Sequence, residues 1–240
     1  SLTGSQIIWD VLVRQGVEVV FGYPGGAIMP AYDALPEFPL RHVLVRHEQG
    51  AAHMADGFAR ASGKVGVCVA TSGPGATNLV TGIATAMMDS IPMVCITGQV
   101  PSTLIGSDAF QETDITGVCL PITKHNFVVT RAEDIMPAIR QAFYIASSGR
   151  PGPVIVDITK DAQNQTIEYQ YDSRPVRLPG YRPERHPLPD ELEEAVEMIE
   201  NAKRPIIFCG HGIIKANATA ALLEFVQKTN IPVAQTLLGL

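Results

Sequence analysis

The 240-residue sequence predicts an α/β fold built on an open, mostly parallel sheet with helices on both faces. Over residues 1–162, short β-branched runs alternate with small-residue segments of helical length. The β-branched runs are apolar throughout, as in strands that are buried on both faces. Hydrophobic residues make up 46% of the chain and charged residues 18%, which allows a sizeable core and excludes wholesale disorder.

The expected elements follow one another in the strand–helix order of a parallel sheet. We expect strands at 19–21, 43–45, 65–70, 93–97 and 154–158. Helices are expected near 3–15, 48–62, 76–88 and 133–148. Thr3 and Gln6 have the spacing of a capping box, which predicts the start of the first helix.

The alternation of apolar strand and helix patterns ends after residue 162. Prolines interrupt residues 163–188, and we expect an extended interdomain linker there. Residues 189–240 are expected to begin a second, Rossmann-like α/β domain, with helix 190–202, strand 205–209, helix 219–228 and strand 231–234. One pair of parallel strands cannot cover both faces of a sheet, so this domain is expected to be incomplete or completed by other polypeptide.

Composition excludes several classes of protein. The net charge of −6 disfavours binding to nucleic acid or to an anionic membrane surface, and no apolar run approaches the ~20 residues of a membrane helix. The four cysteines form no CxxC pair, which favours a reduced, intracellular setting over disulfides or a zinc site. The start, Ser1-Leu2-Thr3-Gly4, is neither a signal sequence nor a transit peptide and has no initiator Met, so residues are expected in front of it.

Four glycine-rich segments follow expected strands, where open α/β sheets bind their ligands. They are residues 22–27, 72–78, 98–101 and 210–212. None is a P-loop or a complete dinucleotide motif, and taken singly each is more often an ordinary tight turn.

Glu48 follows a strand and opens a helix, which permits two interpretations. It is either a first-turn acid stabilised by the helix dipole, or a carboxylate placed to hydrogen-bond a ligand nitrogen. The residues alone slightly favour the first interpretation. The small residues of this helix permit close packing against a neighbour, and the nearby His42, His47 and His53 are expected to be ordinary polar positions.

Six strings carry a specific resemblance: FGYPGGAIMP, RHEQGAAHMADGFARASGKVGV, TSGPGATNL, GSDAFQE, ITKHN and SGRPGPVIVDITKD. They resemble the catalytic subunits of the acetohydroxyacid synthase (acetolactate synthase) family, in that family's order and spacing over the whole chain. The resemblance implies a thiamine-diphosphate (ThDP) enzyme that also uses Mg²⁺ and FAD. Its activity would be decarboxylation of pyruvate and ligation of the two-carbon unit to pyruvate or 2-ketobutyrate in branched-chain amino-acid synthesis. Residues 1–162 would then be the pyrimidine-binding domain, and 189–240 the start of the central, FAD-contacting domain.

The resemblance also implies roles for single residues. Glu48 would be catalytic, protonating N1′ of the ThDP aminopyrimidine so that the imino tautomer can remove the thiazolium C2 proton. The other positions that match ThDP contacts are Tyr23, Pro74, Asn78 and Gln111. Those that match the walls of the substrate channel are Gly26, Ala27, Pro101, Phe110 and Lys160. Those that match flavin contacts are Arg150, Gly210, Thr236 and Leu237.

One departure from the family pattern concerns the metal. The family binds the diphosphate and Mg²⁺ through a Gly-Asp-Gly motif, and no such string occurs here. We therefore expect no metal site in this chain, and expect it to be an N-terminal portion or a cleaved piece of a longer enzyme that lacks its C-terminal catalytic domain here. The resemblance implies a homo-oligomer, dimer or tetramer, with active sites shared between subunits, and a separate small regulatory subunit. Absence of a transit peptide suits a bacterial cytoplasm, although a mature organelle form would look the same.

Two other functions stay open at this point. One is another ThDP enzyme acting on 2-keto acids, of the pyruvate oxidase or glyoxylate carboligase type. The carboxylate at Glu48 argues against the carboligase, and residues 108–112 followed by 122–125 favour the synthase over the oxidases. The other is a non-catalytic module that binds FAD or a nucleotide on the same sheet.

Overall fold

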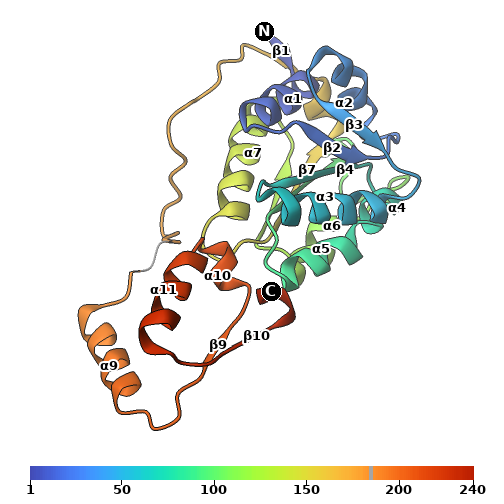
Figure 1. Ribbon diagram of the computed structural model, residues 1–240. Coiled ribbons are helices and arrows are strands. Elements are labelled where there is room, and N and C mark those ends of the chain that lie inside the picture. The colour runs from blue at the N-terminus through green and yellow to red at the C-terminus, as the bar shows by residue number, and fades with distance from the viewer. Residues whose placement is uncertain (184–185) are drawn as a thin grey trace. The chain divides into compact units, whose positions relative to one another are not determined.

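The computed structural model describes residues 1–183 and 186–240 and divides the chain into two compact units, Ser1–Glu184 and Arg185–Leu240 (Figure 1). Each unit is described by itself below. The expected division into 1–162, 163–188 and 189–240 stays a prediction. No helix among the described residues is both long enough and apolar enough to span a membrane.

The first unit is built on a six-stranded parallel sheet with the strand order β3-β2-β4-β5-β7-β6. These strands are β2 (Val19–Gly22), β3 (Arg41–Leu44), β4 (Gly66–Ala70), β5 (Met93–Gln99), β6 (His125–Val129) and β7 (Pro153–Thr159). The helices are α1 (Gly4–Arg14), α2 (Met29–Ala34), α3 (Glu48–Ser62), α4 (Pro74–Thr77), α5 (Val80–Met88), α6 (Ile115–Cys119), α7 (Ala132–Ser147) and α8 (Lys160–Asn164). The central strands β4, β5 and β7 are buried along their whole length, which explains their continuous apolar runs.

Helices cover both faces of this sheet, which confirms the predicted fold class (Figure 1). On one face α1, α2 and α7 pack over a core that includes Trp9 and Ile135. On the other, α3, α5 and α6 enclose a second core that includes Ile83 and Cys119. The capping box predicted at the start of α1 is also present, because Thr3 Oγ1 accepts from the Gln6 N–H at 3.2 Å and Gln6 Oε1 accepts from the Thr3 N–H at 3.0 Å.

Several features of the first unit differ from the sequence prediction, among them the short helices α2, α6 and α8, which are too brief to show a helical period. The edge strand β6 was not predicted, because its residues are partly exposed and lack a continuous apolar run. The helix expected at 76–88 is two helices, α4 and α5, separated at Asn78 and Leu79. A short antiparallel pair, β1 (Leu2–Thr3) with β8 (Thr166–Ile167), also escaped prediction since two-residue strands carry no periodic pattern.

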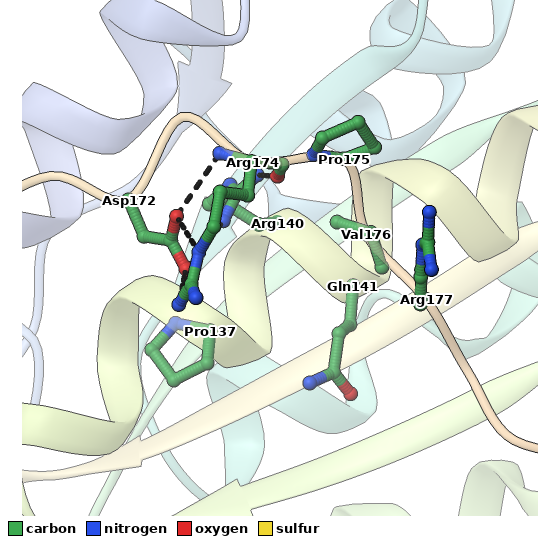
Figure 2. Close-up of a pocket in the computed structure, with 8 residues that line it drawn as sticks. All are labelled: Pro137, Arg140, Gln141, Asp172, Arg174, Pro175, Val176 and Arg177. Carbon is green, nitrogen blue, oxygen red and sulfur yellow. Dashed lines mark hydrogen bonds and ion pairs between the residues drawn. The ribbon is translucent and has the colours of Figure 1, made fainter.

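Within the first unit, the segment after β8 packs against helices α1 and α7. The Tyr169 hydroxyl donates to the Asp10 carboxylate at 2.6 Å, and the Arg14 and Arg140 guanidinium carbons lie 4.8 and 5.4 Å from the centroid of the Tyr171 ring. Figure 2 shows the pocket between α7 and residues 172–177, where the Asp172 carboxylate accepts two hydrogen bonds from the Arg174 side chain.

The second unit contains β9 (Ile207–Cys209) and β10 (Val233–Gln235), which pair in parallel from Val233 opposite Ile207 to Gln235 opposite Cys209. Its helices are α9 (Pro189–Glu200), α10 (Gly212–Lys215) and α11 (Thr219–Thr229). The order of a leading helix, a strand, a helix and a parallel strand agrees with the predicted start of a Rossmann-like α/β domain.

Candidate functional site

The order of the strands places a crevice at the carboxyl end of β2. The chain runs from β2 to its neighbour β3 on one side and from β4 to its neighbour β5 on the other side, so the connections after β2 and β4 leave in opposite directions. Two hydrogen bonds connect the β2 loop with the end of β4: Tyr23 N–H donates to the Val69 carbonyl at 3.2 Å, and Ala27 N–H donates to Thr71 Oγ1 at 3.1 Å. The predicted ThDP contact Tyr23 is exposed here.

Glu48 is the first residue of α3, and its carboxylate is held by the β4 loop. His47 caps the helix, because its Nδ1 accepts from the Gln49 N–H at 3.1 Å. Asn78 Nδ2 donates to Glu48 Oε2 at 2.9 Å, so the structure brings these two predicted residues together. The other oxygen has room because Gly75 carries no side chain: a Cβ there would lie 3.2 Å from Glu48 Oε1. The predicted contact Pro74 begins α4 in the same loop and is exposed.

Gln111 lies against the β4 loop as well. A Cβ on Gly73 would lie 2.4 Å from the Gln111 carbonyl oxygen, so a side chain at Gly73 would push the two backbones apart. Gln111 itself has a φ of 59°, a left-handed conformation that is uncommon outside glycine. Backbone strain of this kind is maintained only where the surrounding contacts fix the chain.

A cavity of about 250 Å³ opens beside Gln111 at the same edge of the sheet. The loops after β2 and β5 and the start of α8 line it. All five residues expected in the substrate channel are on its walls: Gly26, Ala27, Pro101, Phe110 and Lys160. Their roles stay predictions, but the structure does bring together residues that are up to 134 positions apart in the sequence.

Sequence reasoning missed four further residues of this cavity, namely Ser72, Val100, Leu104 and Ala109. Each lies within three positions of a residue that was predicted or in the glycine-rich loop of β4. Segment 100–113 contains only a short 3₁₀ helix (Ser102–Leu104), so no periodic pattern predicts which of its side chains face inward.

Side chains brace this segment internally. The Glu112 carboxylate accepts from the N–H groups of Gly106 and Ala109, and these backbone hydrogen bonds lower the pKa of Glu112. At the start of the segment, the Asp161 carboxylate accepts from the Ser102 N–H at 3.0 Å. The wall that carries Phe110 is therefore a defined loop.

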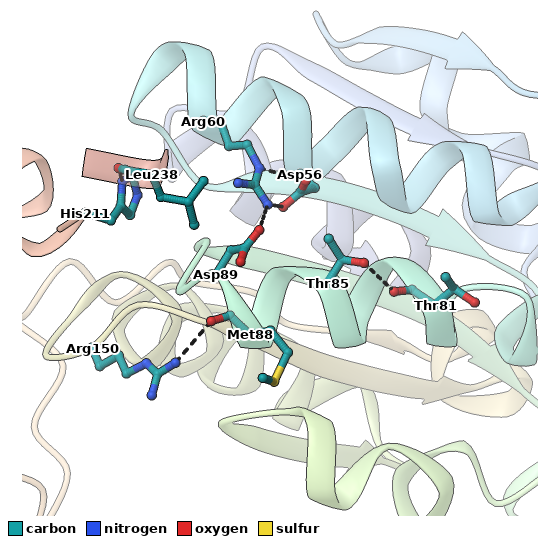
Figure 3. A network of polar contacts seen from close by, with 9 residues as sticks. All are labelled: Asp56, Arg60, Thr81, Thr85, Met88, Asp89, Arg150, His211 and Leu238. Atoms are coloured by element: carbon teal, nitrogen blue, oxygen red, sulfur yellow. Dashed lines mark hydrogen bonds and ion pairs between the residues drawn. The ribbon is translucent and has the colours of Figure 1, made fainter. Parts of the chain in front are cut away.

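The four residues expected at the flavin belong to different units. Arg150 lies in the first unit, where its Nε donates to Ser90 Oγ at 2.7 Å. Its Nη2 donates to the Met88 carbonyl at 3.2 Å (Figure 3). In the second unit, Gly210 and Thr236 meet at the carboxyl ends of β9 and β10, and a Cβ on Gly210 would lie 3.1 Å from Thr236 Oγ1. Leu237 follows and is exposed.

The histidines near Glu48 have ordinary surroundings. His47 is the helix cap described above, and His42 Nε2 lies 3.3 Å from the Tyr32 hydroxyl, where burial lowers the pKa of His42. Within residues 1–183 and 186–240, no group of three or more His, Cys, Asp or Glu side chains is arranged to hold a metal ion.

Comparison with known proteins gives matches over the whole chain. Two family models match, described as "Thiamine pyrophosphate enzyme, N-terminal TPP binding domain" at residues 2–118 and "Thiamine pyrophosphate enzyme, central domain" at residues 192–240. The chain is 53% identical over 240 residues to the acetolactate synthase large subunit of Corynebacterium glutamicum, covering 100% of this chain and 38% of that protein. It is 51% identical to the probable acetolactate synthase large subunit of Methanocaldococcus jannaschii, covering 99% and 41%.

A third relative is the acetolactate synthase large subunit of Haemophilus influenzae, which is 51% identical over 242 aligned positions, covering 100% of this chain and 42% of that protein. The chain thus spans about two fifths of the length of these relatives.

Proposed function

The chain belongs to the thiamine pyrophosphate enzyme family, and from this premise we propose that it is the pyrimidine-binding part of an acetolactate synthase, with the start of the central domain. The proposed reaction decarboxylates pyruvate and ligates the two-carbon unit to pyruvate or 2-ketobutyrate, in branched-chain amino-acid biosynthesis. It is a transfer of a two-carbon unit. Support comes from the names of the relatives that match the whole chain.

The carboxylate of Glu48 is the observation that carries the proposal. When bound, ThDP supplies the electron sink for decarboxylation and the carbon nucleophile for ligation. Glu48 would hold a proton at the pyrimidine nitrogen through one carboxylate oxygen, while Asn78 occupies the other at 2.9 Å and fixes the plane of the carboxylate. Tyr23, Pro74 and Gln111 would line the ring, since all three lie in the loops that meet at this edge of the sheet.

The cavity beside Gln111 is the proposed path of the 2-keto acid. Lys160 gives its wall a positive charge, which attracts the carboxylate of the substrate. Gly26, Ala27, Pro101 and Phe110 give it a mainly apolar lining, although Phe110 is exposed in this chain.

The other cofactors follow the family resemblance. The Gly-Asp-Gly motif through which the family binds Mg²⁺ does not occur in the sequence, so we propose that the metal site lies outside this chain. FAD is proposed to contact Arg150 in the first unit and Gly210, Thr236 and Leu237 in the second. An Arg suits a diphosphate since its planar guanidinium donates two parallel hydrogen bonds.

Partners are proposed on the same basis. The relatives are called large subunits, which supports a separate small regulatory subunit for this protein. We also propose a homo-oligomer with each active site shared between subunits, in which the C-terminal catalytic domain of a partner subunit binds the diphosphate of ThDP. All four cysteines are free, which supports a reducing compartment, and we propose the cytoplasm.

The test is a chimaera in which this chain replaces the matching 240-residue segment of the C. glutamicum relative. With ThDP, Mg²⁺ and FAD supplied and pyruvate as the only substrate, we expect acetolactate. The isolated chain under the same conditions is the control and is expected to be inactive. Oxygen consumption without acetolactate would indicate the oxidase type instead, and tight flavin binding by the isolated chain with an inactive chimaera would indicate a non-catalytic module.

A further inference from the structure

A buried polar network joins the sheet to the loop that walls the cavity. Its centre is Gln99, the last residue of β5, whose side chain makes three hydrogen bonds. Gln99 Oε1 accepts from the Val100 N–H at 2.8 Å, and Gln99 Nε2 donates to the Thr113 carbonyl at 3.0 Å. Val100 and Thr113 are the two ends of segment 100–113, so one side chain holds both ends of this segment.

Asp157 on the neighbouring strand β7 sets the orientation of that amide. Its Oδ2 accepts from Gln99 Nε2 at 2.9 Å, and its Oδ1 accepts from Thr97 Oγ1 at 2.6 Å. Because a carboxylate offers only acceptors, the Gln99 nitrogen must face Asp157 and its oxygen must face Val100. Asp157 is 2% exposed and Gln99 5%, so water does not replace these bonds.

The segment held in this way supplies six of the ten residues that line the cavity: Val100, Pro101, Leu104, Ala109, Phe110 and Gln111. Its inner turns are braced by Glu112 and its start by Asp161, but among the side-chain bonds described, only those of Gln99 reach both ends. If the Gln99 amide were flipped or removed, segment 100–113 would no longer be held in a fixed position relative to the sheet.

We propose that Gln99 and Asp157 are positioning residues that fix the cavity wall at 100–113 and thereby set the affinity for the 2-keto acid, an inference that rests on the proposed function. Neither side chain is among the residues that line the cavity. They act through the loop, and Asp157 acts through Gln99.

The first measurement is hydrogen exchange on the 240-residue chain, which requires no activity. Gln99→Met keeps the volume and removes all three hydrogen bonds, and we expect exchange in segment 100–113 to become about tenfold faster or more, the equivalent of about one lost hydrogen bond. Asp157→Leu, which leaves Gln99 in place, should reproduce the effect in part. Asp157→Asn should stay near the wild type, since its oxygen can accept from Gln99 and its nitrogen can donate to Thr97.

Asp56→Asn is the matched control. Asp56 is also buried and also accepts side-chain hydrogen bonds, from Arg60 on α3 (Figure 3). Asp56→Asn should leave the rate of hydrogen exchange in segment 100–113 unchanged. Slow exchange in β5 and β7 reports that each variant has folded. Unchanged exchange of 100–113 in both Gln99→Met and Asp157→Leu would overturn the proposal, as would an equal effect of Asp56→Asn.

The second measurement uses the acetolactate-forming chimaera. We expect Gln99→Met to raise KM for pyruvate about tenfold while kcat changes less than about threefold, and Asp157→Asn to restore most of the affinity. A loosened segment with an unchanged KM would refute the positioning role. If the unsubstituted chimaera forms no acetolactate, the proposed function fails, and the exchange data alone decide whether Gln99 and Asp157 hold the segment.

Discussion

At the scale of single residues, the proposed chemistry depends on the carboxylate of Glu48. Glu48→Gln keeps the size of the side chain and the hydrogen bond to Asn78 but removes the acid, so turnover of the active chimaera should fall by about 10²- to 10⁴-fold. Stability should change little, because only a first-turn charge is lost. The measurement is the rate of acetolactate formation with saturating ThDP.

The control for this substitution is Glu133→Gln. Glu133 is likewise an acid in the first turn of a helix, α7, and its side chain is exposed. This variant should lose a few tenths of a kcal/mol of stability and no activity. Near-normal turnover of Glu48→Gln would exclude the proposed proton transfer, and equal losses in both variants would point to a structural cause.

Asp157 gives a prediction about pH. Burial raises the pKa of Asp157 to about 6, although the hydrogen bonds from Thr97 and Gln99 lower it, and the charge of Asp114 raises it further. The native state therefore binds the proton more tightly than the unfolded chain, whose Asp titrates near ~4. Between about pH 4 and pH 6 the native state holds more protons, so the contribution of Asp157 to stability falls as the pH rises.

Asp157→Asn removes this titration. The free energy of unfolding of the variant minus that of the wild type should increase by about 2 to 3 kcal/mol from pH 4 to pH 7, since each pKa unit corresponds to about 1.4 kcal/mol. Urea unfolding of both proteins across this range measures it. A difference that stays constant with pH would show that Asp157 titrates normally.

At the scale of elements, the contact between α3 and α5 depends on a glycine. A Cβ on Gly82 would lie 2.4 Å from Ala52 Cβ, and both residues are buried, which confirms that the small residues of α3 permit close packing. Gly82→Ala should therefore lower the free energy of unfolding by about 1 to 3 kcal/mol through overpacking.

Gly57→Ala is the matched variant on the exposed side of α3. A Cβ on Gly57 would meet nothing within 4 Å, and alanine favours the helix. This change should therefore raise the free energy of unfolding by about 0.5 to 1 kcal/mol. Denaturant midpoints of the two variants should move in opposite directions. Equal shifts would mean that the distance between α3 and α5 does not limit the packing.

The elements that the sequence predicts well are those with a long or fully buried apolar pattern. The buried strands β4, β5 and β7 and the long helices α3 and α7 were predicted within a few residues, because burial on both faces or a long amphipathic pattern identifies them. The edge strand β6 was missed since only one of its five residues, Val129, is fully buried.

The candidate site shows the same contrast. The resemblance named Gly26, Ala27, Pro101, Phe110 and Lys160, and the structure brings all five to one cavity. No pattern in the sequence indicated that Gln99 binds both ends of one loop, because its bond to Thr113 spans an irregular segment without periodicity. Its bond to Asp157 depends on the register between β5 and β7.

At the scale of the whole molecule, the two units contain very different amounts of core. The first unit has two clusters of buried side chains on either side of six strands. In the second, β9 and β10 form a two-stranded sheet, and large apolar side chains such as Leu192, Met198 and Phe208 are exposed, Phe208 to 74%. A sheet of two strands with so little covered apolar surface is marginal on its own.

In the isolated chain, the free energy of local unfolding should therefore be much lower for the second unit than for the first. Hydrogen exchange should be fast at 207–209 and 233–235 and slow at 93–99 and 153–159, because local stability follows the burial of apolar contacts. In the chimaera, residues of the relative extend the second unit, and exchange at 207–209 should slow by at least about tenfold while the strands of the first unit stay unchanged. Slow exchange of β9 and β10 already in the isolated chain would mean that these 55 described residues form a complete domain, and the proposal that more polypeptide covers them would be wrong.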